Sequence, residues 1–178
     1  MERANLIQLA RVVSAMAFTE FTDRFPEASL PIEFGELSYR EFQETAQLLP
    51  DALVSEYIAP LEAELDEYTE VLPAAKITTK GYVAVVYWKA GLLHNHYRLA
   101  TFDKQGNPVE NRVIAGSYLV DDEVTQSAAT ITPERIVYVV SGQTHLEDSL
   151  GAAATSSAIR LGIDDGGVIE ELADPRKN

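Results

Sequence analysis

The strongest constraint on the fold is a long segment, from about Ala75 to Val140, in which short runs of β-branched and aromatic residues recur. The runs cover residues 81–88, 97–102, 112–115 and 135–140. Glycine, proline, asparagine and aspartate fill the gaps between them, which is the composition expected of turns between antiparallel strands. The segment therefore predicts an antiparallel β-meander, of about five to seven strands once weaker strand patterns further along the chain are included.

The sequence before this segment has the periodicity of helices. Apolar side chains recur every three or four positions in residues 3–20, which predicts one amphipathic helix. Ser38 and Glu41 have the spacing of a capping box and predict a helix over residues 39–48. A further helix is predicted over residues 61–71, although its carboxylates at i,i+4 spacing repel one another.

These patterns together predict an α+β fold, in which a helical N-terminal third packs on one face of the antiparallel β-meander. All 178 residues are expected to form a single domain, residues 1–178, with residues 1–74 mainly helical and residues 75–172 mainly antiparallel strands. The alternative is a sheet that curls into a partial barrel. The sequence carries no internal repeat and no low-complexity tract that would indicate another organisation.

Three motifs resemble those of uncharacterised bacterial proteins with a helix-then-β-meander layout. They are Phe25-Pro26-x-x-Ser29-Leu30-Pro31, the strand pattern of residues 82–88, and Ala100-Thr101-Phe102-Asp103-Lys104-Gln105-Gly106. The resemblance covers roughly residues 25–140. Its motifs are structural, so the resemblance implies no activity and assigns no functional residue.

Charge is distributed unevenly along the chain, whose formal net charge is −14. Residues 1–75 hold 15 acidic and 4 basic side chains, whereas residues 76–178 hold 13 acidic and 10 basic ones. Such an acidic field opposes binding to phosphate backbones, so a nucleic-acid partner is not expected. The acidic half instead favours a basic protein partner, with Glu62, Glu64 and Glu67 as candidate contacts. The alternative is that these carboxylates only keep the protein in solution.

Other sequence features exclude whole classes of site. The sequence contains no cysteine, which excludes disulfides, thiol nucleophiles and cysteine-based zinc or iron–sulfur centres. No run approaches the ~20 apolar residues that a membrane-spanning helix needs, so no membrane association is expected. The apolar N-terminal stretch differs from a leader because Glu2 stands where basic residues belong. The expected location is the cytoplasm, although a leader already removed would leave no trace.

Histidine is the side chain that ordinarily titrates near neutrality, and the chain contains three. His94 and His96 stand two positions apart, so on a strand they face the same side and can chelate a metal, with His145, Glu147 or Asp148 completing the site. The simpler alternative is that they are exposed residues leaving a turn. No nucleophile elbow and no phosphate-binding loop is present, so no catalytic residue is assigned and no cofactor is expected.

Aromatic side chains concentrate in the predicted strands, and Tyr87, Trp88 and Tyr97 are candidates for a ligand platform on an uncovered sheet face. The alternative places them in the core. The first functional hypothesis is therefore a non-enzymatic binding or protein-interaction module that takes a basic protein partner or a small ligand. One alternative is a small hydrolase or metal-dependent enzyme built around the histidines, and another is a structural subunit of an assembly. The ligand and the oligomeric state do not follow from the sequence.

Overall fold

The computed structural model describes residues 14–62, 65–66, 68–91, 94–145 and 155–173. Strand accounts for 53% of the structure and helix for only 17%. Within this part of the chain, the strands join in one antiparallel sheet of nine strands. The molecule is therefore built around a sheet, and its helices are short.

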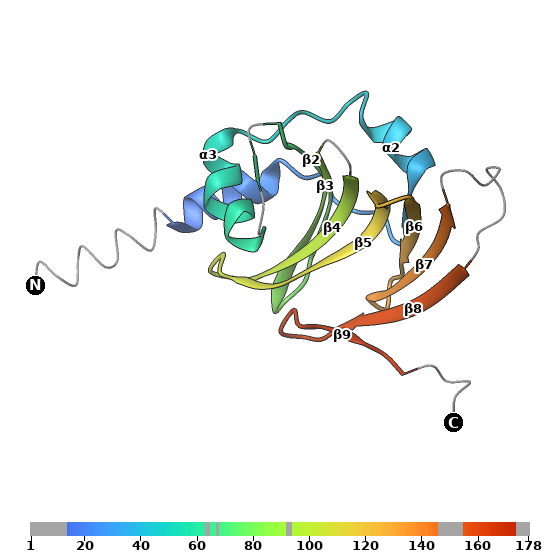
Figure 1. The fold of residues 1–178 in the computed structure, drawn as a ribbon. Coiled ribbons are helices and arrows are strands. Elements are labelled where there is room, and N and C mark those ends of the chain that lie inside the picture. Colours follow the sequence, from blue (N-terminus) through green and yellow to red (C-terminus); the bar gives the residue numbers. More distant parts are fainter. Residues whose placement is uncertain (1–13, 63–64, 67, 92–93, 146–154, 174–178) are drawn as a thin grey trace, which may run out of the picture.

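Eight strands follow one another in the sheet in chain order, from β2 to β9, and β1 joins separately through β6 (Figure 1). The strands are β1 (Ile32–Phe34), β2 (Glu70–Thr78), β3 (Tyr82–Ala90), β4 (His94–Asp103), β5 (Pro108–Val120), β6 (Glu123–Ile131), β7 (Ile136–His145), β8 (Thr155–Ile163) and β9 (Ile169–Glu171). Every named strand pair is antiparallel, so the predicted antiparallel sheet is confirmed.

The helical segments all precede β2 in the chain. Residues 14–23 are helical, and α2 (Glu36–Phe42) contains seven residues. After Pro50, the chain winds through α3 (Asp51–Leu53), a π-helical turn η1 (Val54–Ile58) and a 3₁₀ turn η2 (Ala59–Leu61). Three kinds of helical winding thus follow one another directly before Glu62.

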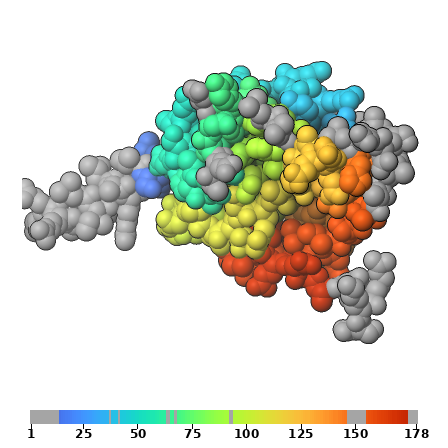
Figure 2. All heavy atoms as spheres, viewed as in Figure 1, coloured from blue at the N-terminus to red at the C-terminus, as the bar shows by residue number. Residues whose placement is uncertain are grey.

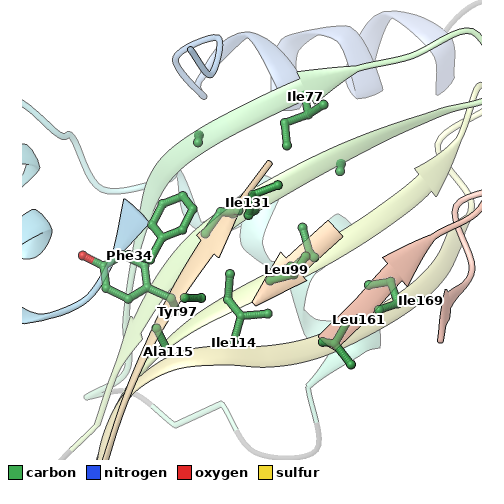
Figure 3. Close-up of a cluster of buried hydrophobic side chains, with 14 of the residues drawn as sticks. Phe34, Ile77, Tyr97, Leu99, Ile114, Ala115, Ile131, Leu161 and Ile169 are labelled. Carbon is green, nitrogen blue, oxygen red and sulfur yellow. The ribbon is translucent and has the colours of Figure 1, made fainter. Parts of the chain in front are cut away.

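The sheet curls around an apolar core, here called the inner cluster (Figure 3). Its buried members are Phe34, Leu72, Ala75, Ile77, Tyr82, Ala84, Val86, Trp88, Tyr97, Leu99, Ile114, Ala115, Ala129, Ile131, Val137, Val139, Leu161, Ile163 and Ile169. Side chains alternate between the two faces of a strand, and each of the nine strands turns one face towards this core and contributes members to it. The Thr101 hydroxyl donates to the Gly167 carbonyl at 2.6 Å and so joins β4 to the turn before β9.

A second core, the outer cluster, lies on the opposite face of β2, β3 and β4. Its members are Phe18, Phe21, Phe25, Leu49, Leu53, Tyr57, Ile58, Val71, Val83, Val85, Tyr87, Ala100 and Phe102. The helical segments supply aromatic rings to it, and Phe21 stacks on Tyr57 with ring centroids 4.7 Å apart. Residues 14–23 and 51–61 thus cover β2, β3 and β4 on this face, whereas Tyr39 and Phe42 of α2 pack against the inner cluster (Figure 1).

The predicted α+β class is wrong, because the structure is mostly antiparallel sheet with small helices and has no helical third. The helix predicted over residues 61–71 does not form: Glu62 has extended backbone angles (φ −115°, ψ 128°), and β2 begins at Glu70. Val71 and Leu72 are instead buried on opposite faces of β2, where pairing with β3 outweighs their helical spacing.

The predicted capping box is also wrong. The helix begins at Glu36, two residues before Ser38, and it ends at Phe42. Ser38 lies in its first turn, where its hydroxyl accepts a hydrogen bond of 2.8 Å from the Gly35 N–H. The hydroxyl therefore still satisfies a free backbone donor at the helix start, but as the third helical residue and not as the cap.

Gly116 marks the point at which β5 changes its partners. Before Gly116 the strand pairs with β4, and from Gly116 onward it pairs with both β4 and β6. A bulge precedes the change, and Gly116 has a φ of 127°. A Cβ atom there would lie 2.1 Å from the Asn95 carbonyl oxygen, so only glycine allows the strands this close. This close approach places Tyr118 beside β4.

Candidate functional site

The most unusual side chain of the described structure is Glu62, a carboxylate that is only 2% exposed. Four side chains of the sheet donate to it, and we call them the cradle: Tyr87, Lys89, Arg98 and Asn111. Tyr87 Oη, Arg98 Nε and Asn111 Nδ2 lie 2.5, 2.6 and 3.4 Å from Oε1. Lys89 Nζ lies 2.9 Å from Oε2. Both carboxylate oxygens are therefore engaged.

The register of three neighbouring strands places these donors together. Tyr87 and Lys89 are two positions apart on β3 and so project from the same face. Arg98 on β4 is the Cα partner of Tyr87. Asn111 on β5 pairs with Ala100, a member of the outer cluster on that same face. The cradle is thus the polar continuation of the outer cluster.

Burial makes these contacts consequential, because an ionised group away from water is costly unless it is paired and hydrogen-bonded. The Lys89 and Arg98 side chains are 7% and 19% exposed. Burial raises the pKa of the Tyr87 phenol far above its ordinary value, and the adjacent Glu62 charge raises it further. Tyr87 therefore remains protonated and serves as a hydrogen-bond donor.

Beside the cradle lie three rings, here called the ring ladder: His94, His96 and Tyr118. The two imidazoles stack with centroids 5.2 Å apart, and His96 meets the edge of Tyr118 at 5.7 Å. His96 is the Cα partner of Lys89, which connects the ladder to the cradle.

His96 is held in its neutral form. Its pKa is lowered from 6.5 to about 4, first by burial and then by the charges of His94, Arg98 and Lys89. At neutral pH the ring therefore offers one N–H donor and one acceptor nitrogen, not a positive charge. Together, the cradle and the ladder can hold a carboxylate next to the faces and edges of rings.

The six predicted binding residues lie in different parts of the structure. It brings Glu62 and Tyr87 into direct contact. Trp88 and Tyr97 point into the inner cluster, where they are 7% and 1% exposed; Trp88 stacks on Tyr39 with centroids 4.3 Å apart. Those two rings therefore serve the core in the structure. Glu64 and Glu67 lie outside the described residues.

The three histidines do not converge. His94 and His96 lie together on β4, whereas His145 ends β7 beyond two intervening strands and contacts Glu123 at 3.7 Å. In the described parts of the chain, no three His, Asp or Glu side chains are grouped closely enough to hold a metal ion. Glu147 and Asp148 lie outside the described residues.

Sequence reasoning missed Lys89, Arg98, Asn111 and Tyr118 as site residues. One signal for Lys89 is present in the sequence: it continues the alternation of Val83, Val85 and Tyr87, so it belongs to the buried face. Arg98 has a similar position relative to Ala100 and Phe102. When a cation occupies a strand position whose alternate neighbours are all buried, it indicates that a buried anion pairs with it.

Comparison with protein-family models, with curated proteins and with solved structures found no match to this chain. In the described ranges, no helix is both long and apolar enough to cross a membrane. The candidate function therefore rests on the geometry of the cradle and the ring ladder.

Proposed function

We propose that this protein is a non-enzymatic binding module that takes a small ligand carrying a carboxylate. The ligand lies on the ring ladder of His94, His96 and Tyr118, beside the cradle. The observation that carries the proposal is the convergence on Glu62 of Tyr87, Lys89, Arg98 and Asn111, since this donor set already holds a carboxylate.

The position of these donors in the fold supports a binding role. Tyr87, Lys89 and Arg98 stand on β3 and β4, which are each paired along both edges, and Asn111 stands on the part of β5 that pairs with β4. Binding groups on such strands are positioned more precisely than groups on loops. A ligand that meets them loses less free energy to ordering the protein.

The ring ladder supports a ligand with a flat or apolar part. His94, His96 and Tyr118 are each partly exposed, in contrast to the buried rings of the two clusters. Rings next to fixed donors suit ligands that combine an apolar body with one charged group. Benzoate has this chemistry and is a suitable first probe.

The test is an NMR titration of the wild-type protein with benzoate, with neutral benzamide as the matched control. The protein has only three histidines, so each imidazole C–H signal can be assigned by substitution. We expect benzoate to shift the His94 and His96 signals, and to leave the His145 signal in place because that ring lies on β7. Equal shifts with benzamide, or no shift at His94 and His96, would refute the proposal.

A basic protein partner for the acidic half remains a separate proposal. Glu62 adds little to it, because its carboxylate is engaged by cations of its own chain. Exposed carboxylates such as those of Glu20, Asp23 and Glu36 remain for such a partner, although each contacts a basic side chain of this chain.

A further inference from the structure

We propose that Glu62 is an internal ligand of the cradle, which a carboxylate-bearing molecule must displace in order to bind fully. This inference rests on the proposed function and adds a mode of regulation to it. The chain would hold its own anion site closed until the external carboxylate outcompetes Glu62.

The donors and the acceptor come from different parts of the chain, which supports this assignment. All four donors belong to β3, β4 and β5, whose pairing does not involve Glu62. Glu62 lies outside the sheet, in the connection between η2 and β2. In Figure 2, the teal atoms of the helical segment before β2 lie next to the yellow atoms of the β4–β5 region. The site is therefore a product of the sheet, and its occupant comes from a different segment.

The segment that leads to Glu62 is irregular. Within residues 51–61, the winding changes from α to π and then to 3₁₀, ending at Leu61. π-Helical turns are rare, and they are frequent at functional sites. The Leu61 carbonyl accepts from Asn111 Nδ2 at 2.9 Å, so the same amide contacts both the backbone of this segment and the Glu62 side chain. Movement of the segment would release both contacts together.

A purely structural ion pair would behave differently. In that case Glu62 would be needed to assemble Tyr87, Lys89 and Arg98, and the donors would rearrange once it was removed. An internal ligand leaves a formed site behind, because the strand register positions the donors. The two accounts therefore predict opposite results when Glu62 is truncated and a free carboxylate is supplied.

The experiment compares Glu62→Ala with the wild type in acetate and in chloride at equal ionic strength. Acetate carries the same carboxylate and adjacent carbon that the substitution removes. We expect acetate to raise the melting temperature of Glu62→Ala saturably, by on the order of 3–6 °C at about ten times its dissociation constant. The wild type should bind acetate at least about tenfold more weakly.

Glu110→Ala is the matched control, because Glu110 is a partly exposed carboxylate of β5 that pairs with Arg112 and meets Asn111 through the backbone N–H, not through the cradle side chain. It should respond to acetate no more than the wild type does. Glu62→Gln is the second variant in case Glu62→Ala does not fold. Its amide keeps one accepting oxygen and places an NH2 group against either Lys89 or Arg98, which contact different oxygens of Glu62, so acetate should displace it.

Three results would overturn the inference. The first is that acetate raises the melting temperature of neither Glu62 variant beyond that of Glu110→Ala, and the second is that both variants fail to fold in acetate. The third is that phosphate, used in place of acetate, raises the melting temperature when acetate does not. The benzoate titration is independent of these measurements. Shifts at His94 and His96 combined with a null acetate result would leave the proposed function standing and remove only the internal ligand.

Discussion

The two faces of β3 bury different kinds of side chain. On one face, Tyr82, Ala84, Val86 and Trp88 enter the inner cluster and meet side chains from every other strand. On the other face, Val83 and Val85 lie in the outer cluster, but the same row ends at Tyr87 and Lys89 in the cradle. One strand thus supports an apolar core and a charged site, separated only by the thickness of the sheet.

The difference concerns what each face tolerates. Apolar contacts are non-directional, so the inner cluster tolerates exchange among apolar side chains of similar volume. The cradle depends on direction and on partners, since removing one member of a buried ion pair leaves the others uncompensated. The cradle, and not the inner cluster, is the candidate site because its contacts commit particular partners.

The largest effect is expected from Glu62→Ala in ordinary buffer. Truncation leaves Lys89 and Arg98 without a carboxylate that they contact at 2.9 and 2.6 Å, which should lower the free energy of unfolding by about 3–5 kcal/mol. Urea denaturation measures this loss. Glu110→Ala should cost less than about 1 kcal/mol, because the pair of Glu110 with Arg112 is more exposed. Equal losses in the two variants would show that the cradle has no special burial.

A smaller effect is expected on the apolar face. Leu99→Ala removes a fully buried side chain of the inner cluster and should lower the free energy of unfolding by about 3 kcal/mol. Val113→Ala is the control, because Val113 on the neighbouring strand is 40% exposed; its loss should remain below about 1 kcal/mol. Acetate should rescue neither variant. A loss for Leu99→Ala as small as that for Val113→Ala would contradict the packed inner cluster.

The smallest effect is a dependence on pH that comes from His96. Its pKa is about 4 in the folded protein and about 6.5 in the unfolded chain, so the unfolded chain binds the proton first as the pH falls. The contribution of His96 to stability is therefore present above about pH 6.5 and lost as the pH falls towards 4. The effect is modest, because the side chain is partly exposed.

Urea melts at about pH 7 and about pH 4.5 check the sign of this effect. His96→Gln should lose less stability than the wild type between the two values. If His96→Gln and the wild type lost the same amount, the imidazole would not be held neutral by its surroundings.

Much of the sheet could be predicted from the sequence, because alternation of side chains is a local property. The strand patterns over residues 81–88, 97–102 and 135–140 correspond to β3, β4 and part of β7. For the N-terminal third, local periodicity alone could not decide between helix and strand. The spacing of Val71 and Leu72 is compatible with a helix. They form a strand because they pair with β3 and because both faces of β2 are buried there.

The site was predictable only in part. Tyr87 and Glu62 were named separately, one as an aromatic platform and the other as an acidic surface contact. Their contact joins positions 25 apart and depends on how the chain returns from η2 to the sheet, which no local pattern encodes. Lys89 and Arg98 were missed because a cation on a strand is ordinarily an exposed residue.

The pairing of β1 with β6 has a consequence for the order in which the chain folds. Ile32 lies opposite Ile131, 99 positions further along the sequence, whereas each hairpin of the sheet joins near neighbours. The entropy lost in closing so long a loop delays that contact, so the hairpins should form first. During synthesis, Phe34 cannot pair with Ala129 until β6 has left the ribosome. The earliest strand to be made is thus among the last to be placed.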